Sequence, residues 1–324
     1  MVRRLRSWHD CRVDLGVHLP LVQFGEERLS LGRLEGAVDA ARDCGFAALS
    51  TNDHFVFQTP WLDGPTALAS MIERSGQMTL ATTVSLPVLR GPVPLAKALA
   101  AIDVLSDGRL VAALGPGSSE RDYDVLGVPF EERWKRFDEA LAVLRALLNG
   151  EPLPAEPRYY PVAPDIELAP GPRREDGIPL WIGSWGSRAG LARVARAGDG
   201  WLASAYNTTP EGFSAARTAL ACALEARGRH ADGFPTALAT MWTWVSKDRS
   251  EADRVLGDVL APVLRRDPED LCGQVCVGPP EHCVELLSRY AEAGCQRVYL
   301  WPLGDEQRQL ELVADTVTPQ LVPL

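Results

Sequence analysis

Short apolar runs alternate with amphipathic helical segments along almost the whole chain, and this alternation restricts the fold more than any other feature. A run that is apolar on both faces is typical of a strand in a parallel sheet that helices cover. The expected strands span residues 12–19, 46–50, 78–85, 109–115, 178–184, 200–204, 236–246 and 297–303. The expected helices span residues 31–45, 64–76, 94–106, 131–150, 187–198, 209–228, 251–266 and 279–294. Eight strands that alternate with helices predict an α/β fold, the closed (β/α)8 TIM barrel.

An open, doubly wound sheet is the competing topology, because it has the same alternation of strands and helices. That fold places a glycine-rich G-x-G-x-x-G turn after its first strand. This chain instead reads GVHLPLVQFG at that point, which does not match. The sequence therefore favours the closed barrel.

Two stretches interrupt the alternation. Residues 151–177 follow the fourth helix and contain seven prolines with little periodicity, which predicts an insertion loop. A second insertion precedes the eighth strand, where two helical patterns follow one another without a strand between them. Residues 1–324 are otherwise expected to form a single barrel domain.

Composition excludes several kinds of partner. The net charge is −10 and the basic residues form no extended cluster, so a nucleic-acid partner is not expected. The chain has no apolar run of membrane-spanning length and no secretory signal, so we expect no membrane contact. Seven cysteines, an odd number, favour reduced thiols and a cytoplasmic location. The expected partners are a small-molecule substrate and a second copy of the chain, as a homodimer.

A zinc site is the alternative interpretation of the cysteine cluster near the C-terminus. Cys272, Cys276 and Cys283 lie close together in sequence, with His282 beside them. The cluster lacks the Cys-x2-Cys spacing of a zinc knuckle and a second ligand pair. No metal site is therefore predicted.

The carboxyl ends of barrel strands are where such enzymes place their active sites. The residues expected at or near those ends include His18, Asn52, Asp53, His54, Thr83, Val84, Ser85, Gly115, Pro116, Gly117, Ser118, Gly183, Ser184, Ser204, Tyr206, Asn207, Trp242, Trp244 and Trp301. This set contains no carboxylate pair for glycoside cleavage, no metal ligand set and no Ser-His-Asp order. Its glycine turns suit a phosphate, and its aromatic side chains suit a flat ring. A bound cofactor is therefore expected to carry the chemistry.

Six segments, in the right order, resemble the bacterial luciferase-like flavin and coenzyme F420-dependent oxidoreductases. They read GVHLP, GFAALSTNDHF, LATTVSLPVLRGPVPLAKALAAIDVLSDGRLVAALGPGS, RWKRFDEALAVLR, IPLWIGSWGSRAGLARVARAGDGW and VGPPEHCVELLSRYAEAGCQRVYL. Together they cover nearly the whole chain. The resemblance is specific for fold and superfamily and much weaker for the substrate.

This resemblance implies roles for particular residues. Thr83-Val84 is similar to the family's non-proline cis peptide beneath the tricyclic ring, and Asp53-His54 to its Asp-His pair near the redox edge. The turns expected to hold the ribityl phosphate side are Gly115, Pro116, Gly117 and Ser118 after the fourth strand, and Gly183 and Ser184 after the fifth. On the sequence alone, His54 serves equally well as a structural imidazole or as an acid–base group, and the resemblance favours the second.

The leading hypothesis is hydride transfer between coenzyme F420 and a small organic substrate, with His54 moving the proton and Asp53 fixing its tautomer. His18, Trp244 and Tyr159 are the expected substrate contacts, Tyr159 by way of the proline-rich loop. Sugar-phosphate dehydrogenases of the family carry a Glu where this chain has Ser118-Ser119, which argues against that substrate. The alternatives are an FMN-dependent monooxygenase and a noncatalytic, cofactor-free barrel subunit.

Overall fold

Parallel strands close into a barrel in the computed structural model, which describes residues 13–24 and 28–321. The barrel strands are β1 (Asp14–His18), β2 (Ala48–Thr51), β3 (Thr79–Ser85), β4 (Leu110–Leu114), β5 (Leu180–Gly183), β6 (Gly200–Ser204), β7 (Thr236–Val245) and β9 (Arg297–Pro302). The ladder runs β6-β5-β4-β3-β2-β1-β9-β7, and β6 also pairs with β7, which closes the ring. The predicted (β/α)8 barrel is confirmed.

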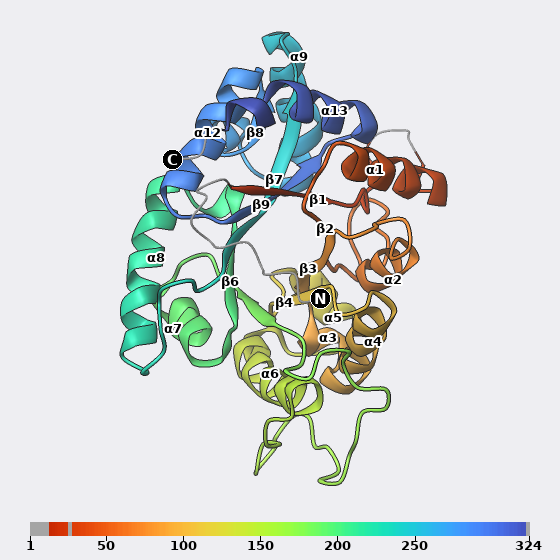
Figure 1. Ribbon diagram of the computed structural model, residues 1–324, viewed down its shortest axis with the longest axis vertical. Coiled ribbons are helices and arrows are strands. Elements are labelled where there is room, and N and C mark those ends of the chain that lie inside the picture. The colour runs from red at the N-terminus through yellow and green to blue at the C-terminus, as the bar shows by residue number, and fades with distance from the viewer. Residues whose placement is uncertain (1–12, 25–27, 322–324) are drawn as a thin grey trace, which may run out of the picture.

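Helices surround the ring of strands (Figure 1). They are α1 (Leu31–Asp43), α2 (Gly64–Ser70), α3 (Pro87–Arg90), α4 (Pro92–Leu105), α5 (Glu120–Val125), α6 (Arg133–Asn149), α7 (Arg188–Ala197), α8 (Pro210–Glu225), α9 (Arg249–Arg254), α10 (Ala261–Leu264), α11 (Pro268–Leu271), α12 (Pro280–Glu292) and α13 (Glu306–Thr316). Helical turns of other types are η1 (Phe130–Glu132), η2 (Ala205–Asn207), η3 (Val255–Leu260, a π-helix) and η4 (Thr318–Gln320). The packing of these helices on the strands buries the main apolar core.

Local signals in the sequence account for several helix boundaries. Thr209 caps α8, with its side chain accepting from the amide of Gly212, and Pro210 occupies the first turn. Ser187 caps α7 in the same way. Gly150 ends α6 in the left-handed conformation, which glycine adopts without a steric penalty. Both Thr209 and Gly150 were predicted to mark these boundaries.

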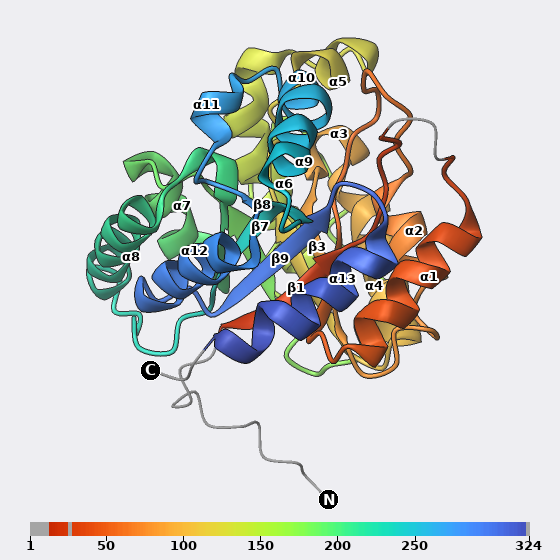
Figure 2. The ribbon, with the colours of Figure 1, turned by 90° about the horizontal axis from the view of Figure 1, so that it is seen from above.

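Two insertions lie where the sequence places them. Residues 151–177 contain no helix or strand and extend from the barrel beyond α6 (Figure 1). The second insertion contains a short strand, β8 (Cys276–Gly278), that pairs only with the outer end of β7. The predicted helix 251–266 is instead α9, the π-helix η3 and α10 in succession. In Figure 2, α9 to α11 gather at the same end of the molecule as α5.

Strand β7 changes direction at this end of the barrel. Its pairing with β9 shifts register between Leu238 and Met241, and Thr240 between them has a φ of 57°. Residues other than glycine uncommonly adopt this left-handed backbone conformation, and those that do are often found at functional sites. The irregular segment therefore marks the mouth of the barrel above β6 and β7.

No helix in the described part of the chain is long and apolar enough to cross a membrane. The six cysteines that the structure describes are free thiols, and Cys11 lies outside the described residues. The homodimer and the cytoplasmic location stay predictions.

Candidate functional site

A cavity of about 420 Å³ opens at the carboxyl ends of the strands, within the size range of small-molecule sites. Its lining residues are Asn52, Asp53, His54, Thr83, Val84, Leu86, Gly115, Pro116, Gly117, Ser118, Asp122, Phe130, Arg133, Trp134, Gly183, Ser184, Trp185, Ser187, Gly190, Leu202, Ala203, Ser204, Tyr206, Ala239 and Thr240. Every residue predicted to contact the cofactor is among them. The structure thus brings residues from six strands, β2 to β7, or from the turns that directly follow them, into one site.

The floor of the cavity is the end of β3. The peptide bond between Thr83 and Val84 is cis, as the sequence resemblance implies. A Cβ atom added to Gly115 would lie 2.9 Å from Val84 Cγ2, and one added to Gly183 would lie 2.9 Å from Val84 Cγ1. Real Cβ atoms essentially never approach other heavy atoms so closely, so Val84 occupies a space that only two glycines leave open. We call Val84, Gly115 and Gly183 the glycine cradle.

Asp53 supports this floor from below. Its amide donates to the carbonyl of Val84 at 3.1 Å, and its Oδ2 accepts from the amide of Leu86 at 3.1 Å. Arg90 Nε and Nη2 donate to the two carboxylate oxygens at 2.8 and 2.7 Å, and Arg90 also pairs with Asp63. Asp53 is buried, so these contacts compensate a charge that would otherwise be unpaired in the interior.

Removing Arg90 tests this arrangement. Arg90→Ala is expected to lower the free energy of unfolding by about 3 kcal/mol, because the carboxylate of Asp53 then stays buried without its cation. Urea unfolding followed by circular dichroism measures the change. Arg42→Ala removes an arginine that forms exposed pairs with Asp39 and Asp43, and is expected to change little. An equal loss in both variants would contradict a supporting role for Arg90.

His54 contacts a carboxylate that the sequence prediction missed. Its Nδ1 lies 2.8 Å from Asp122 Oδ2, whereas the prediction assigned this role to Asp53. That assignment is wrong, because the carboxylate of Asp53 is turned toward Arg90 and Leu86. Asp122 Oδ1 also accepts from the amides of Phe55 and Val56, at 3.0 and 2.8 Å.

The electrostatics of Asp122 follow from these contacts. Burial alone raises the pKa of a carboxyl group. Hydrogen bonds from His54, Val56 and Phe55 and the attraction of the imidazole outweigh burial, so the net pKa of Asp122 is lowered. Asp122 is therefore ionised at neutral pH and only accepts hydrogen bonds.

Aromatic side chains surround the imidazole of His54. Its ring centroid lies 4.9 Å from that of Phe57 and 4.5 Å from that of Trp61. One fifth of the His54 side chain is exposed, and its Nε2 has no hydrogen-bond partner among the described residues. The ring is thus fixed on one side and has one free nitrogen at the cavity.

The three predicted substrate contacts do not line the cavity. His18 stacks beneath Trp301 at 3.5 Å and donates from Nδ1 to the carbonyl of Leu19, and burial lowers its pKa to about 3. Trp244 lies beyond the barrel rim, because the outer end of β7 pairs with β8. Tyr159 packs beneath the guanidinium of Arg136, on the side of α6. Strand length and loop course, which periodicity does not specify, place these side chains elsewhere.

Four buried indole N–H groups have no hydrogen-bond partner among the described residues. In the described part of the chain, the indole N–H groups of Trp61, Trp242, Trp244 and Trp301 are buried without a partner. In contrast, Trp201 Nε1 donates to the carbonyl of Ser184 at 2.9 Å. Buried indole N–H groups normally have a partner. None of these four tryptophans is among the residues that line the cavity, so their N–H groups are not donors to a ligand bound there.

The far side of the cavity is polar and adjoins the first turn of α7. The Ser184 hydroxyl accepts from the amide of Gly186 at 3.3 Å, and the Ser187 hydroxyl accepts from the amide of Gly190 at 3.2 Å. The amides at a helix N-terminus and its dipole favour an anion. Trp134 and Trp185 are exposed at the rim of the same cavity.

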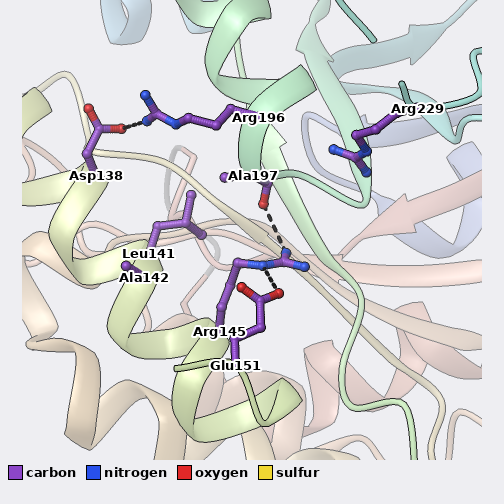
Figure 3. A pocket seen from close by; sticks show the side chains of 8 residues that line it. All are labelled: Asp138, Leu141, Ala142, Arg145, Glu151, Arg196, Ala197 and Arg229. Atoms are coloured by element: carbon purple, nitrogen blue, oxygen red, sulfur yellow. Dashed lines mark hydrogen bonds and ion pairs between the residues drawn. The ribbon is translucent and has the colours of Figure 1, made fainter. Parts of the chain in front are cut away.

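A second hollow, of about 410 Å³, lies on the outside of the barrel beside α6 and α7 (Figure 3). Its arginines are already paired. Arg145 donates to the carbonyl of Ala197 and to Glu151, and Arg196 donates to Asp138. These contacts cap the end of α7. Among the described residues, no group of three or more His, Cys, Asp or Glu side chains is placed to hold a metal.

Comparison with known proteins places the chain in a family. The luciferase-like monooxygenase family model matches residues 15–297. The F420-dependent glucose-6-phosphate dehydrogenase of Nocardia farcinica is 26% identical over 345 residues, covering 95% of this chain and 98% of that protein.

Two solved structures share the fold. An F420-dependent secondary alcohol dehydrogenase, in complex with an F420-acetone adduct, has a TM-score of 0.82 at 17% identity, covering 96% of this chain and 99% of that chain. An FMN-bound type II Baeyer-Villiger monooxygenase from Pseudomonas putida has a TM-score of 0.71 at 16% identity, covering 96% of this chain and 99% of that chain. At these identities the two structures establish the fold alone. Because the family model spans most of the sequence, the chain belongs to the luciferase-like monooxygenase family of oxidoreductases.

Proposed function

We propose that the protein binds coenzyme F420 in the cavity at the strand ends and transfers a hydride to or from a small organic substrate. One observation carries this proposal. A single cavity joins an imidazole with a free nitrogen, that of His54, to a glycine cradle and a polar helix end. The relative from Nocardia farcinica, whose name states F420 dependence, supports the choice of cofactor.

The residues present fit such a group. Gly115 and Gly183 make room for the side chain of Val84 at the floor of the cavity, and they carry no side chain that would obstruct a flat ring there. Ser184 and Ser187 lie at the first turn of α7, where backbone amides and the helix dipole favour a phosphate. Arg133 also lines the cavity and adds positive charge near this end. These residues would hold the cofactor with its phosphate toward α7.

The bound deazaflavin would supply the hydride donor or acceptor. The chain itself provides the proton. His54 gives a proton to the substrate oxygen, or takes one from it, at Nε2, the ring nitrogen that has no partner among the residues the structure describes. Phe57 and Trp61 pack against the imidazole and leave one fifth of the His54 side chain exposed.

The two carboxylates at the cavity are both engaged, Asp53 by Arg90 and Asp122 by His54. Neither takes the place of the Glu that sugar-phosphate dehydrogenases of the family carry after the fourth strand. The proposed substrate is accordingly a secondary alcohol or ketone rather than a sugar phosphate.

Titration of the purified protein with F420 and, separately, with FMN tests the cofactor. We expect a shift in the visible spectrum of F420 and quenching of tryptophan fluorescence, since Trp134 and Trp185 lie at the rim. The bound cofactor is then expected to change its absorbance on addition of alcohols or ketones. A response to FMN alone, with oxygen consumption on reduction, would replace the proposal with a monooxygenase. Binding of neither cofactor would indicate a noncatalytic barrel.

A further inference from the structure

We propose that Asp122 is the positioning residue for His54, and that its carboxylate keeps the imidazole proton on Nδ1 so that Nε2 exchanges the proton with the substrate. The effect on turnover rests on the proposed function, but the effect on the imidazole does not. Asp122 lies on α5, 68 residues from His54 in sequence.

Asp122 is placed to do this by three hydrogen bonds. Its Oδ2 faces His54 Nδ1 at 2.8 Å, and its Oδ1 accepts from the amides of Phe55 and Val56 at 3.0 and 2.8 Å. Only 2% of the Asp122 side chain is exposed. One buried carboxylate therefore fixes both the ring of His54 and the backbone that follows it.

The tautomer follows from the chemistry of the acceptor. An ionised carboxylate has no proton to donate, so the short contact with His54 requires the proton to be on Nδ1. In the neutral imidazole, Nε2 is then the acceptor. This is the form that takes a proton from an alcohol, and its protonated form returns one to a ketone.

Helix α5 is itself anchored to the turn that follows β4. The Tyr123 hydroxyl donates to the carbonyl of Pro116, and the Tyr123 side chain is fully buried. The Tyr123 ring packs edge-on against Phe130 at 5.1 Å. Ser119 caps the helix, with its hydroxyl accepting from the amide of Asp122 at 3.4 Å. The Asp122 carboxylate is thus held in a fixed position relative to the turn after β4, one of the two glycine turns of the site.

The neighbouring carboxylate cannot substitute for Asp122. Asp53 precedes His54 in sequence, yet both of its oxygens are engaged by Arg90 and the amide of Leu86. The two acids therefore have separate tasks: Asp53 supports the cis turn, and Asp122 orients the imidazole.

Asp122→Asn tests the proposal in the full chain. The side-chain carbonyl of Asn can still accept from Phe55 and Val56, while its NH2 group donates to Nδ1 and favours the proton on Nε2. We expect the 15N and 1H shifts of His54 to move from the Nδ1–H to the Nε2–H pattern. We also expect kcat to fall roughly tenfold to 100-fold with little change in cofactor Kd, as for other residues that orient a functional side chain. The spectrum of His54→Ala identifies the His54 signals.

Asp124→Asn is the matched control, because Asp124 lies on the same helix and is exposed. It is expected to leave the His54 signals and kcat unchanged. Asp122→Glu, which keeps the carboxylate, is expected to retain the Nδ1–H pattern. The double variant that combines Asp122→Asn with His54→Ala is expected to turn over no more slowly than His54→Ala alone.

Two results would overturn the proposal. One is unchanged His54 signals in Asp122→Asn. The other is a kcat of the double variant that is lower than that of His54→Ala by the full factor that Asp122→Asn causes alone. If the tautomer changes as expected but the wild-type protein transfers no hydride with F420, the proposed function fails while the positioning role of Asp122 stands. The NMR measurement needs no cofactor, so the two failures are distinguishable.

Discussion

His54→Ala is expected to lower kcat by roughly 10² to 10⁴-fold, the range that a positioned acid–base group contributes. Among the described residues His54 is the one histidine that lines the cavity, its Nε2 has no hydrogen-bond partner there, and the carboxylates of Asp53 and Asp122 are both paired. Stopped-flow absorbance of the bound cofactor measures the hydride-transfer rate directly. Binding of the cofactor is expected to change little, because the glycine cradle is left intact.

His230→Ala is the control for the loss of an imidazole, since His230 is exposed and is not among the residues that line the cavity. It is expected to keep wild-type turnover. A His54→Ala variant with the same kcat as wild type would remove His54 from the mechanism. A weak rate restored by added imidazole would support the proton-transfer role over a structural one.

The second large effect concerns the glycine cradle. Gly183→Val is expected to weaken cofactor binding roughly 100-fold, the equivalent of about 3 kcal/mol of overpacking. The new side chain has to displace Val84, whose Cγ1 would lie 2.9 Å from the added Cβ. The other methyl group of Val84 faces Gly115, where an added Cβ would also lie 2.9 Å away, so Val84 packs closely between the two glycines. Fluorescence titration with F420 gives the Kd of each variant.

Gly36→Ala serves as the matched control for adding a side chain. Gly36 lies within α1, and a Cβ there would meet nothing within 4 Å. Alanine at such a helical position is expected to raise the free energy of unfolding by about 0.5 to 1 kcal/mol and to leave cofactor binding unchanged. An undiminished affinity in Gly183→Val would show that the cofactor does not lie against the cradle.

Periodicity predicted the barrel well, because each strand of a parallel sheet is buried on both faces and each covering helix carries one apolar stripe. It missed β8, which has only three residues and lies in the insertion before β9. It also predicted one helix where α9, the π-helix η3 and α10 follow one another. A change from α-helical to π-helical hydrogen bonding hardly alters the spacing of apolar residues in the sequence, so periodicity does not detect it.

The site was predictable where residues directly follow strands. Asp53, His54 and the glycine turns line the cavity because the strand ends of a barrel meet at one face. Asp122 was missed, since it lies on a short helix whose acidic residues resemble an ordinary solvated first turn. The SSERDYD segment, with a capping Ser and a buried Tyr beside the acid, is the signal that could have drawn attention to it.

Closure of the ring by β9 has a consequence during folding. Strand β9 is the last of the nine to be translated, and it fits between β1 and β7, pairing Asp14 with Arg297 across almost the entire chain. Until β9 is in place, β1 and β7 each present an unpaired strand edge, which can recruit strands of other chains. The protein is therefore most prone to aggregation in the partly folded state in which β9 is still unpaired.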